Sequence, residues 1–216
     1  MPTISNELLN DIRSKFAQID SCPVQGQRVF FENAGGALTL NRVVDVSRDY
    51  AAIPDNQGRD NPGSHELVRV IQKAKDDLRV FMNAPSGQFF VGESGTELIF
   101  RLVMNACLGT EDGGVVLGST VEHPATRSAC ARWSKVSRKN HVLIAHDDDL
   151  GLVKAEDYTA HVTQATKVAT ILHTSPVTGM GMDVAAISKA IRAVSPDCYI
   201  IAVSYTHLRA HETIRH

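Results

Sequence analysis

The second half of the chain alternates short, almost uninterrupted apolar runs with amphipathic stretches, and this alternation narrows the possible folds more than any other feature. The apolar runs predict strands at residues 115–117, 142–145, 168–172 and 199–203. The amphipathic stretches predict helices at residues 96–108, 125–137 and 183–194. Strands that are apolar along their whole length are typical of a parallel sheet buried on both faces. The expected fold is therefore α/β, with three α/β/α layers around a mainly parallel sheet.

The first half carries helical patterns and two short apolar runs. Ser5 is expected to cap a first helix, because apolar residues recur at helical spacing from Leu8 to Ile19. A second helix is predicted over residues 40–53, and a long third helix is predicted to begin with Ser64 as its N-cap. The apolar runs at residues 29–32 and 89–91 predict short strands.

Composition argues against several classes of partner. Hydrophobic residues make up 43% of the chain and the net charge is -2, without the clustered basic face that nucleic-acid binding needs. No apolar run approaches the roughly 18 residues of a membrane span, and the polar N-terminus lacks the pattern of a secretory signal. The 4 cysteines are scattered without CxxC spacing, which favours reduced, mostly buried thiols and no metal site. We therefore expect a cytoplasmic protein with neither nucleic-acid nor membrane partners.

The last residues, 204–216, break the pattern of the rest of the chain. They read SYTHLRAHETIRH and show little apolar periodicity. The string resembles the translated read-through of a sequencing adaptor, so we expect a non-native tail. A metal-binding histidine tail is the alternative, because His207 and His211 are spaced four apart.

Polar segments follow three of the predicted strands. Ligands collect at the carboxyl ends of parallel strands, where the following helices offer free N–H groups. Gly95 and Thr96 open the helix after residues 89–91, His123 precedes the helix after residues 115–117, and a polar loop at 173–179 follows residues 168–172. Each segment also has a plain structural interpretation, as a helix cap, a loop histidine and a Pro- and Gly-containing turn.

Five motifs in order carry a resemblance to a known family. They are FENAGG at residues 31–36, NPGSH at 61–65, SGTE at 94–97, EHPA at 122–125 and SPVTG at 175–179. Their order and spacing, over about residues 8–203, resemble the class V aminotransferases, which include the cysteine desulfurases. The resemblance implies a fold type I enzyme that binds pyridoxal 5′-phosphate (PLP) and acts on an amino-acid substrate as a lyase or transferase. It also implies a homodimer for the intact parent protein.

The resemblance assigns roles to individual residues. The backbone at Gly95 and the hydroxyl of Thr96 would hold the phosphate of PLP, and His123 would lie over the pyridine ring as the catalytic histidine. Asn33 and Ala34 would lie near the substrate carboxylate. Residues 1–25 would then be a helix of the small domain, and residues 26–203 an incomplete PLP-binding large domain.

The chain also departs from the family pattern. Pro176 stands where the family has an Asn that contacts the phenolic oxygen of PLP, so that contact would move to Ser175 or Thr178. Ser204 stands where the family has the Asp that pairs with the pyridinium nitrogen. The family's Schiff-base lysine lies further along, and no lysine of this chain follows such a motif.

These departures leave two other interpretations open. The chain could be a non-catalytic fragment or pseudoenzyme that keeps only a phosphate-binding loop. It could also be a nucleotide-binding α/β module that uses the same loop. The second is disfavoured, because the chain contains neither GxGxxG nor GxxxxGK[ST].

Overall fold

The computed structural model describes residues 4–31, 36–54, 57–176 and 178–204. The chain divides into two compact units, the first ending at Phe89 and the second beginning at Phe90. We describe each unit by itself.

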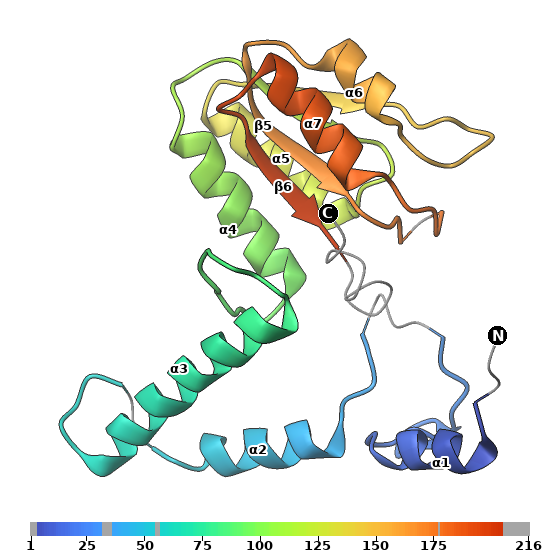
Figure 1. Cartoon of the computed structure of the whole chain (residues 1–216), viewed down its shortest axis with the longest axis vertical. Helices are drawn as coiled ribbons and strands as arrows, with labels where there is room; N and C mark the ends of the chain where they lie inside the picture. The colour runs from blue at the N-terminus through green and yellow to red at the C-terminus, as the bar shows by residue number, and fades with distance from the viewer. Residues whose placement is uncertain (1–3, 32–35, 55–56, 177, 205–216) are drawn as a thin grey trace. The chain divides into compact units, whose positions relative to one another are not determined.

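The second unit is built on a parallel sheet. Its elements are α4 (Gly95–Leu108), β3 (Val115–Ser119), α5 (Pro124–Val136), β4 (Asn140–Ile144), α6 (Ala155–His161), β5 (Thr166–Leu172), α7 (Val184–Val194) and β6 (Tyr199–Val203) (Figure 1). The strands lie in the order β4-β3-β5-β6. Every neighbouring pair runs parallel. Because the chain passes from β3 to β4 on one side and then to β5 on the other, the sheet has its switch point between β3 and β5.

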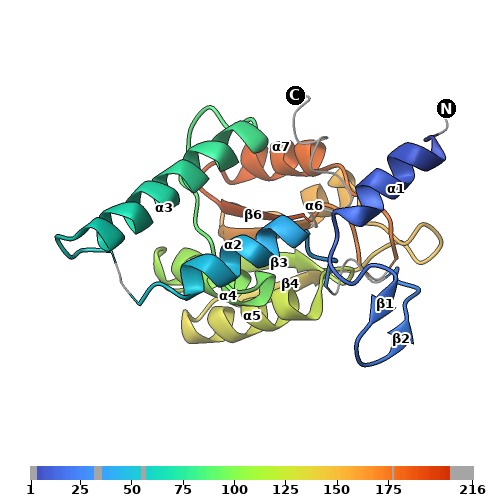
Figure 2. The same ribbon diagram turned by 90° about the horizontal axis from the view of Figure 1, so that it is seen from below.

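Helices cover both faces of this sheet. Val116 and Val168 point into a core formed with α4 and α5. Leu117, Ala169 and Ile171 point into a second core formed with α6 and α7. Figure 2 shows α7 on one side of the strands and α4 with α5 on the other. The predicted three-layer α/β/α fold with a parallel sheet is confirmed.

Two sequence predictions near and within this unit differ from the structure: a predicted strand is absent, and one helix was not predicted. Residues 89–91 form no strand, and Phe90 and Val91 are 83% and 81% exposed. That apolar run has no strand beside it among the described residues, and a strand needs a neighbour to satisfy its backbone groups. The short helix α6 was missed because it is 7 residues long and buries only Tyr158, which leaves no period to recognise.

The described part of the first unit contains three helices and a small hairpin. They are α1 (Asn6–Ser14), β1 (Ser21–Cys22), β2 (Gly26–Gln27), α2 (Asn41–Ala51) and α3 (Pro62–Phe81). Ser5 caps α1 as predicted, with its hydroxyl accepting from the N–H of Leu8 at 3.2 Å.

Two predictions for the first unit are corrected. Asn61, not Ser64, caps α3: its side-chain oxygen accepts from the N–H of Ser64 at 2.9 Å. The helix begins earlier than predicted because Pro62 suits the first helical position, where no N–H is needed. The predicted strand at residues 29–32 is absent over 29–31, and residue 32 lies outside the described residues.

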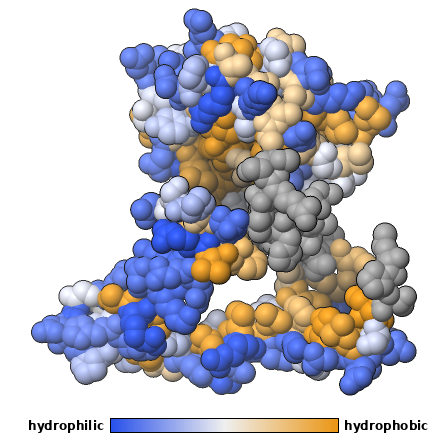
Figure 3. All heavy atoms as spheres, in the orientation of Figure 1, coloured by the Kyte–Doolittle hydropathy of each residue, from blue (hydrophilic) through white to orange (hydrophobic). Residues whose placement is uncertain are grey.

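The helices of the first unit bury few of their apolar side chains. Among the described residues of α1, α2 and α3, only Ser64 is buried. Figure 3 shows apolar side chains gathered along one side of α2. Over the described part of the chain, no helix combines the length and apolar character needed to cross a bilayer. Three cysteines, Cys107, Cys130 and Cys198, are buried thiols, as predicted, and Cys22 is half-buried.

Candidate active site

The start of α4 provides exposed backbone donors. Ser94 is the N-cap, and its hydroxyl accepts from the N–H of Glu97 at 3.1 Å. Gly95 and Thr96 are the first two helical residues and both are exposed. The N–H groups of a first helical turn have no partner inside the helix, and the helix dipole makes this end positive. This end of α4 therefore favours an anion.

The loop before α4 is held tightly against its first turn. The Glu97 carboxylate accepts from the N–H of Glu93 at 3.0 Å. A Cβ on Gly92 would lie 2.5 Å from Oε2 of Glu97 and 2.7 Å from Cδ2 of Leu98, so a larger residue here would displace these two side chains. A Cβ on Gly95 would meet nothing within 4 Å, which leaves open space beside the helix start. Gly92 was not recognised from sequence, since its closeness to Glu97 arises only in the folded loop.

His123 is the N-cap of α5. Its Nδ1 accepts a hydrogen bond from the N–H of Ala125 at 3.0 Å. A nitrogen that accepts carries no proton, so the neutral ring has its proton on Nε2. The imidazole is half-buried, and its attachment to the helix start fixes its tautomer. Its catalytic role remains a prediction.

The residue before His123 has a buried carboxyl group that sequence reasoning passed over. Glu122 is 2% exposed, and its Oε1 accepts from the hydroxyl of Thr170 at 2.7 Å and from the N–H of Ser119 at 3.2 Å. Burial raises the pKa of Glu122 to about 7, against the opposing effect of these two hydrogen bonds. A Cβ on Gly118 would lie 2.9 Å from the Thr170 oxygen and 3.3 Å from Glu122 Oε1. Glycine at 118 therefore makes room for this pair.

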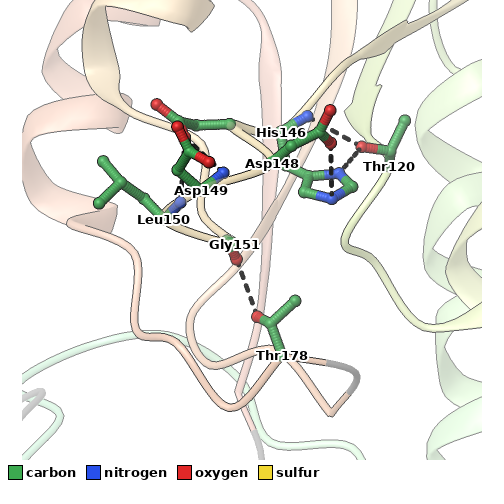
Figure 4. Close-up of polar contacts among 8 residues, drawn as sticks. Thr120, His146, Asp148, Asp149, Leu150, Gly151 and Thr178 are labelled. Carbon is green, nitrogen blue, oxygen red and sulfur yellow. Dashed lines mark hydrogen bonds and ion pairs between the residues drawn. The ribbon is translucent and has the colours of Figure 1, made fainter.

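Ser175 and Thr178 join the loop after β5 to its neighbours. The buried hydroxyl of Ser175 donates to the carbonyl of Val121 at 3.2 Å and accepts from the N–H of Thr178 at 3.1 Å. The hydroxyl of Thr178 donates to the carbonyl of Gly151 at 2.8 Å (Figure 4). These bonds tie the β5 loop to the loops after β3 and β4. The predicted contacts of both hydroxyls with a cofactor remain predictions.

A third tie joins the loops after β3 and β4. The hydroxyl of Thr120 accepts from the backbone N–H of His146 at 3.0 Å and lies 2.7 Å from its Nδ1 (Figure 4). In the neutral tautomer that carries its proton on Nε2, Nδ1 of His146 accepts from the Thr120 hydroxyl. Asp148 lies 3.6 Å from that Nε2.

The end of β6 meets the loop after β5. The N–H of His173 donates to the carbonyl of Val203 at 2.8 Å. Ser204, the residue after β6, has its hydroxyl 2.9 Å from Nδ1 of His173. The carboxyl edge of the sheet therefore presents polar side chains from the loops after all four strands.

Two predicted site residues, Asn33 and Ala34, lie outside the described residues. So do residues 205–216 of the tail, including His207 and His211. Within the described ranges, no cluster of three or more His, Cys, Asp or Glu side chains is arranged to hold a metal ion.

Comparison with solved structures gives the fold. An apo cysteine desulfurase from Thermococcus onnurineus NA1 superposes with a TM-score of 0.75 at 15% identity, over 89% of this chain and 46% of that one. The cysteine desulfurase CsdA from Escherichia coli superposes with a TM-score of 0.71 at 16% identity, over 93% and 49% of the two chains. These similarities place the chain on the fold of the PLP-dependent transferases.

Sequence comparison gives the family. A probable cysteine desulfurase of Mycoplasma genitalium is 23% identical over 176 residues, which are 79% of this chain and 42% of the relative. The chain thus spans a little under half the length of the proteins it matches. The sequence model of the family described as "Aminotransferase class-V" matches residues 29–203. The chain belongs to the class V aminotransferase family.

Proposed function

We propose that this chain forms the phosphate- and ring-binding part of a PLP-dependent enzyme that acts on an amino-acid substrate. The observation that carries the proposal is the exposed start of α4, where the N–H groups of Gly95 and Thr96 pair with none of the described residues and open space lies beside Gly95. A helix of 14 residues is about 21 Å long, enough to run from one edge of the sheet to the other. Since α4 leads into the amino end of β3, its own start lies toward the carboxyl edge, where His123 caps α5.

The residues present fit the phosphate end of PLP. The N–H groups of Gly95 and Thr96 and the Thr96 hydroxyl would bind the phosphate oxygens, supported by the positive end of α4. Bound PLP supplies an electron sink for bonds at the substrate's α-carbon. His123 would lie on the ring and hold its proton on Nε2, since its Nδ1 is engaged with Ala125. The start of α5 thus orients the imidazole, and the start of α4 would orient the phosphate.

Ser175 and Thr178 would order the loop beside the ring. Each hydroxyl donates its single proton to a backbone carbonyl, of Val121 and Gly151 respectively. Contact with the phenolic oxygen of PLP would require one of these hydroxyls to rotate. Pro176, half-buried between them, offers neither a side-chain donor nor an N–H.

For the whole protein we propose a lyase or transferase of the cysteine desulfurase type, acting as a cytoplasmic homodimer. Asn33 and Ala34 would bind the substrate carboxylate. The proposal rests on family membership and on the matched relatives being named as cysteine desulfurases.

For the present chain on its own we propose cofactor binding without turnover. Ser204 is the observation that favours this second candidate, because it follows β6 with a hydroxyl where the resemblance expects a carboxylate. The hydroxyl lies against His173, at 2.9 Å. A hydroxyl cannot hold the ring nitrogen in its protonated state as a carboxylate does.

The test is a comparison of pyridoxamine 5′-phosphate with pyridoxamine, neither of which forms an imine with lysine. Trp133, the single tryptophan, is the fluorescence probe. We expect the phosphorylated form to bind more tightly, and T96V to weaken it about tenfold, since a hydrogen bond to a charged group contributes about 1.5 kcal/mol. T159V, which removes an exposed hydroxyl on α6, is the matched control. Equal binding of both ligands would refute the phosphate site.

A separate assay tests turnover. With added PLP and L-cysteine, we expect the 216-residue chain to release no sulfide. Sustained sulfide release would overturn the proposal of binding without turnover but would leave the phosphate site intact.

A further inference from the structure

A groove runs between α5 and the edge strand β4, apart from the predicted cofactor loops. Its volume is about 320 Å³, and it is lined by Pro124, Arg127, Ser128, Ala131, His141 and Leu143. β4 is the terminal strand of the sheet, so this side of the unit has no further strand over it within the described residues.

Arg127 places an unpaired positive charge at one wall of the groove. The side chain is exposed and forms no ion pair with any of the described residues. It lies near the start of α5, and the first turn of that helix contains no acidic residue. A cation near a helix N-terminus opposes the helix dipole. The charge of Arg127 therefore does not stabilise α5, and it adds to a positive potential that an anion would relieve.

His141 supplies a second unsatisfied group in the same groove. Its Nε2 is buried and, across the described chain, has no hydrogen-bond partner. A buried polar atom without a partner costs free energy, and a ligand that met this nitrogen after a turn of the ring would recover it. Burial lowers the pKa of His141, and the charge of Arg127 lowers it further.

We propose that this groove binds an anionic group, a carboxylate or a phosphate, between Arg127 and His141. The guanidinium matches the two oxygens of such a group, and the imidazole can donate to it once protonated. Ala131 and Leu143 would contact an apolar part of the ligand, and the exposed Ser128 provides a further hydroxyl. None of the residues that line this groove is among those assigned to PLP binding.

Arg127 interacts electrostatically with two titratable side chains nearby, Glu122 and His141. Glu122 interacts electrostatically with Arg127, but its carboxyl is buried and bonded to Thr170. Arg127 in turn acts on His141. An anion in the groove would offset the effect of Arg127 on the imidazole, so binding and protonation of His141 should be linked.

The experiment follows the ring proton of His141 by NMR as inorganic phosphate or acetate is added to the full chain. Sodium chloride at matched ionic strength is the reference, and H141N assigns the resonance. We expect a saturable shift and a raised pKa of His141 with at least one of the two anions. Phosphate alone would indicate a phosphorylated ligand, and acetate alone a carboxylate ligand.

Two arginine variants distinguish a specific anion site from a general electrostatic attraction of anions to the helix. R127Q should weaken binding about tenfold or more, since it removes a charge-assisted bond. R132Q removes an exposed charge from the same helix, outside the groove, and should change the affinity less than twofold. Equal losses in R127Q and R132Q, or no saturable shift at His141, would overturn the proposal.

Discussion

The carboxyl group of Glu122 accepts a hydrogen bond of 2.7 Å from the hydroxyl of Thr170, which links the residue before His123 to strand β5. Burial of this pair raises the pKa of Glu122 from 4.5 to about 7. A titratable group with such a shift beside a predicted catalytic residue is a feature of active sites more often than of ordinary cores.

The first prediction concerns the pH dependence of stability. The folded state binds the Glu122 proton more tightly than the unfolded state, because its pKa is about 7 instead of 4.5. The resulting stabilisation is complete below pH 4.5 and is lost as the pH rises to 7, by on the order of 3 kcal/mol. The variant E122Q has no carboxyl group at this position, so its free energy of unfolding should not show this pH-dependent loss. Urea unfolding between pH 5 and pH 8 should therefore favour E122Q over the parent increasingly with pH. A difference that stays constant with pH would contradict the assignment.

The second prediction concerns Gly118. Its substitution G118A places a Cβ 2.9 Å from the Thr170 oxygen and 3.3 Å from Glu122 Oε1. We expect a loss of about 1–3 kcal/mol, as for other insertions into packed cores. Thermal unfolding measures it. G95A is the control. Its added Cβ meets nothing within 4 Å, so the thermal stability of this variant should match that of the parent protein.

The third prediction concerns Ser175. S175A removes the donor to the Val121 carbonyl and the acceptor for the Thr178 N–H, both in a buried position. The expected cost is about 1–3 kcal/mol in the free energy of unfolding. Hydrogen exchange at Thr178 should also accelerate. S128A, at an exposed serine on α5, should leave both quantities unchanged.

The fourth prediction concerns a buried lysine at the opposite edge of the sheet. The ammonium of Lys139 donates to the carbonyls of Cys107 and Glu111, at 3.0 and 2.6 Å, where α4 ends. K139M leaves these carbonyls without their donor and should cost about 1–3 kcal/mol. K135M, at an exposed lysine on α5, is the control for loss of charge. A similar loss in both variants would argue against a specific role of Lys139.

The fifth prediction concerns thiol reactivity. Burial raises the pKa of Cys130 to about 12 and that of Cys198 to about 11. Hydrogen bonds from the backbone of Gln25 and Val24 lower the pKa of Cys22. Since the thiolate is the reactive form, iodoacetamide should modify Cys22 first, as followed by intact mass. C22S should remove the fast phase, and modification of Cys130 should require denaturant.

The sheet could be read from the sequence because its strands are apolar along their length. β3, β5 and β6 lie at the predicted runs, each extended by at most two residues. One helix cap could also be predicted from sequence: Ser5 caps α1 by accepting from the N–H of Leu8 at 3.2 Å. The strand predicted at residues 89–91 was wrong, because an apolar run indicates burial but does not identify a neighbouring strand with which to pair.

The contacts that shape the candidate site could not be read in this way. Thr120 and His146 are 26 residues apart, and the Ser175 hydroxyl reaches a carbonyl 54 residues away. No local pattern encodes such distances. Glu122 was visible only as one letter of a motif, because a buried carboxyl and a solvent-exposed one look alike in a sequence.

The loops after β3, β4 and β5 are bound to one another through Thr120, Ser175 and Thr178. If one of these loops were replaced by the loop of a relative, the new loop would therefore lack its hydrogen-bond partners in the other two loops. Engineering a new specificity at this edge would require transplanting segments 119–123, 145–152 and 173–182 together. The same dependence would make paired substitutions in these three segments the natural route by which homologues diverge.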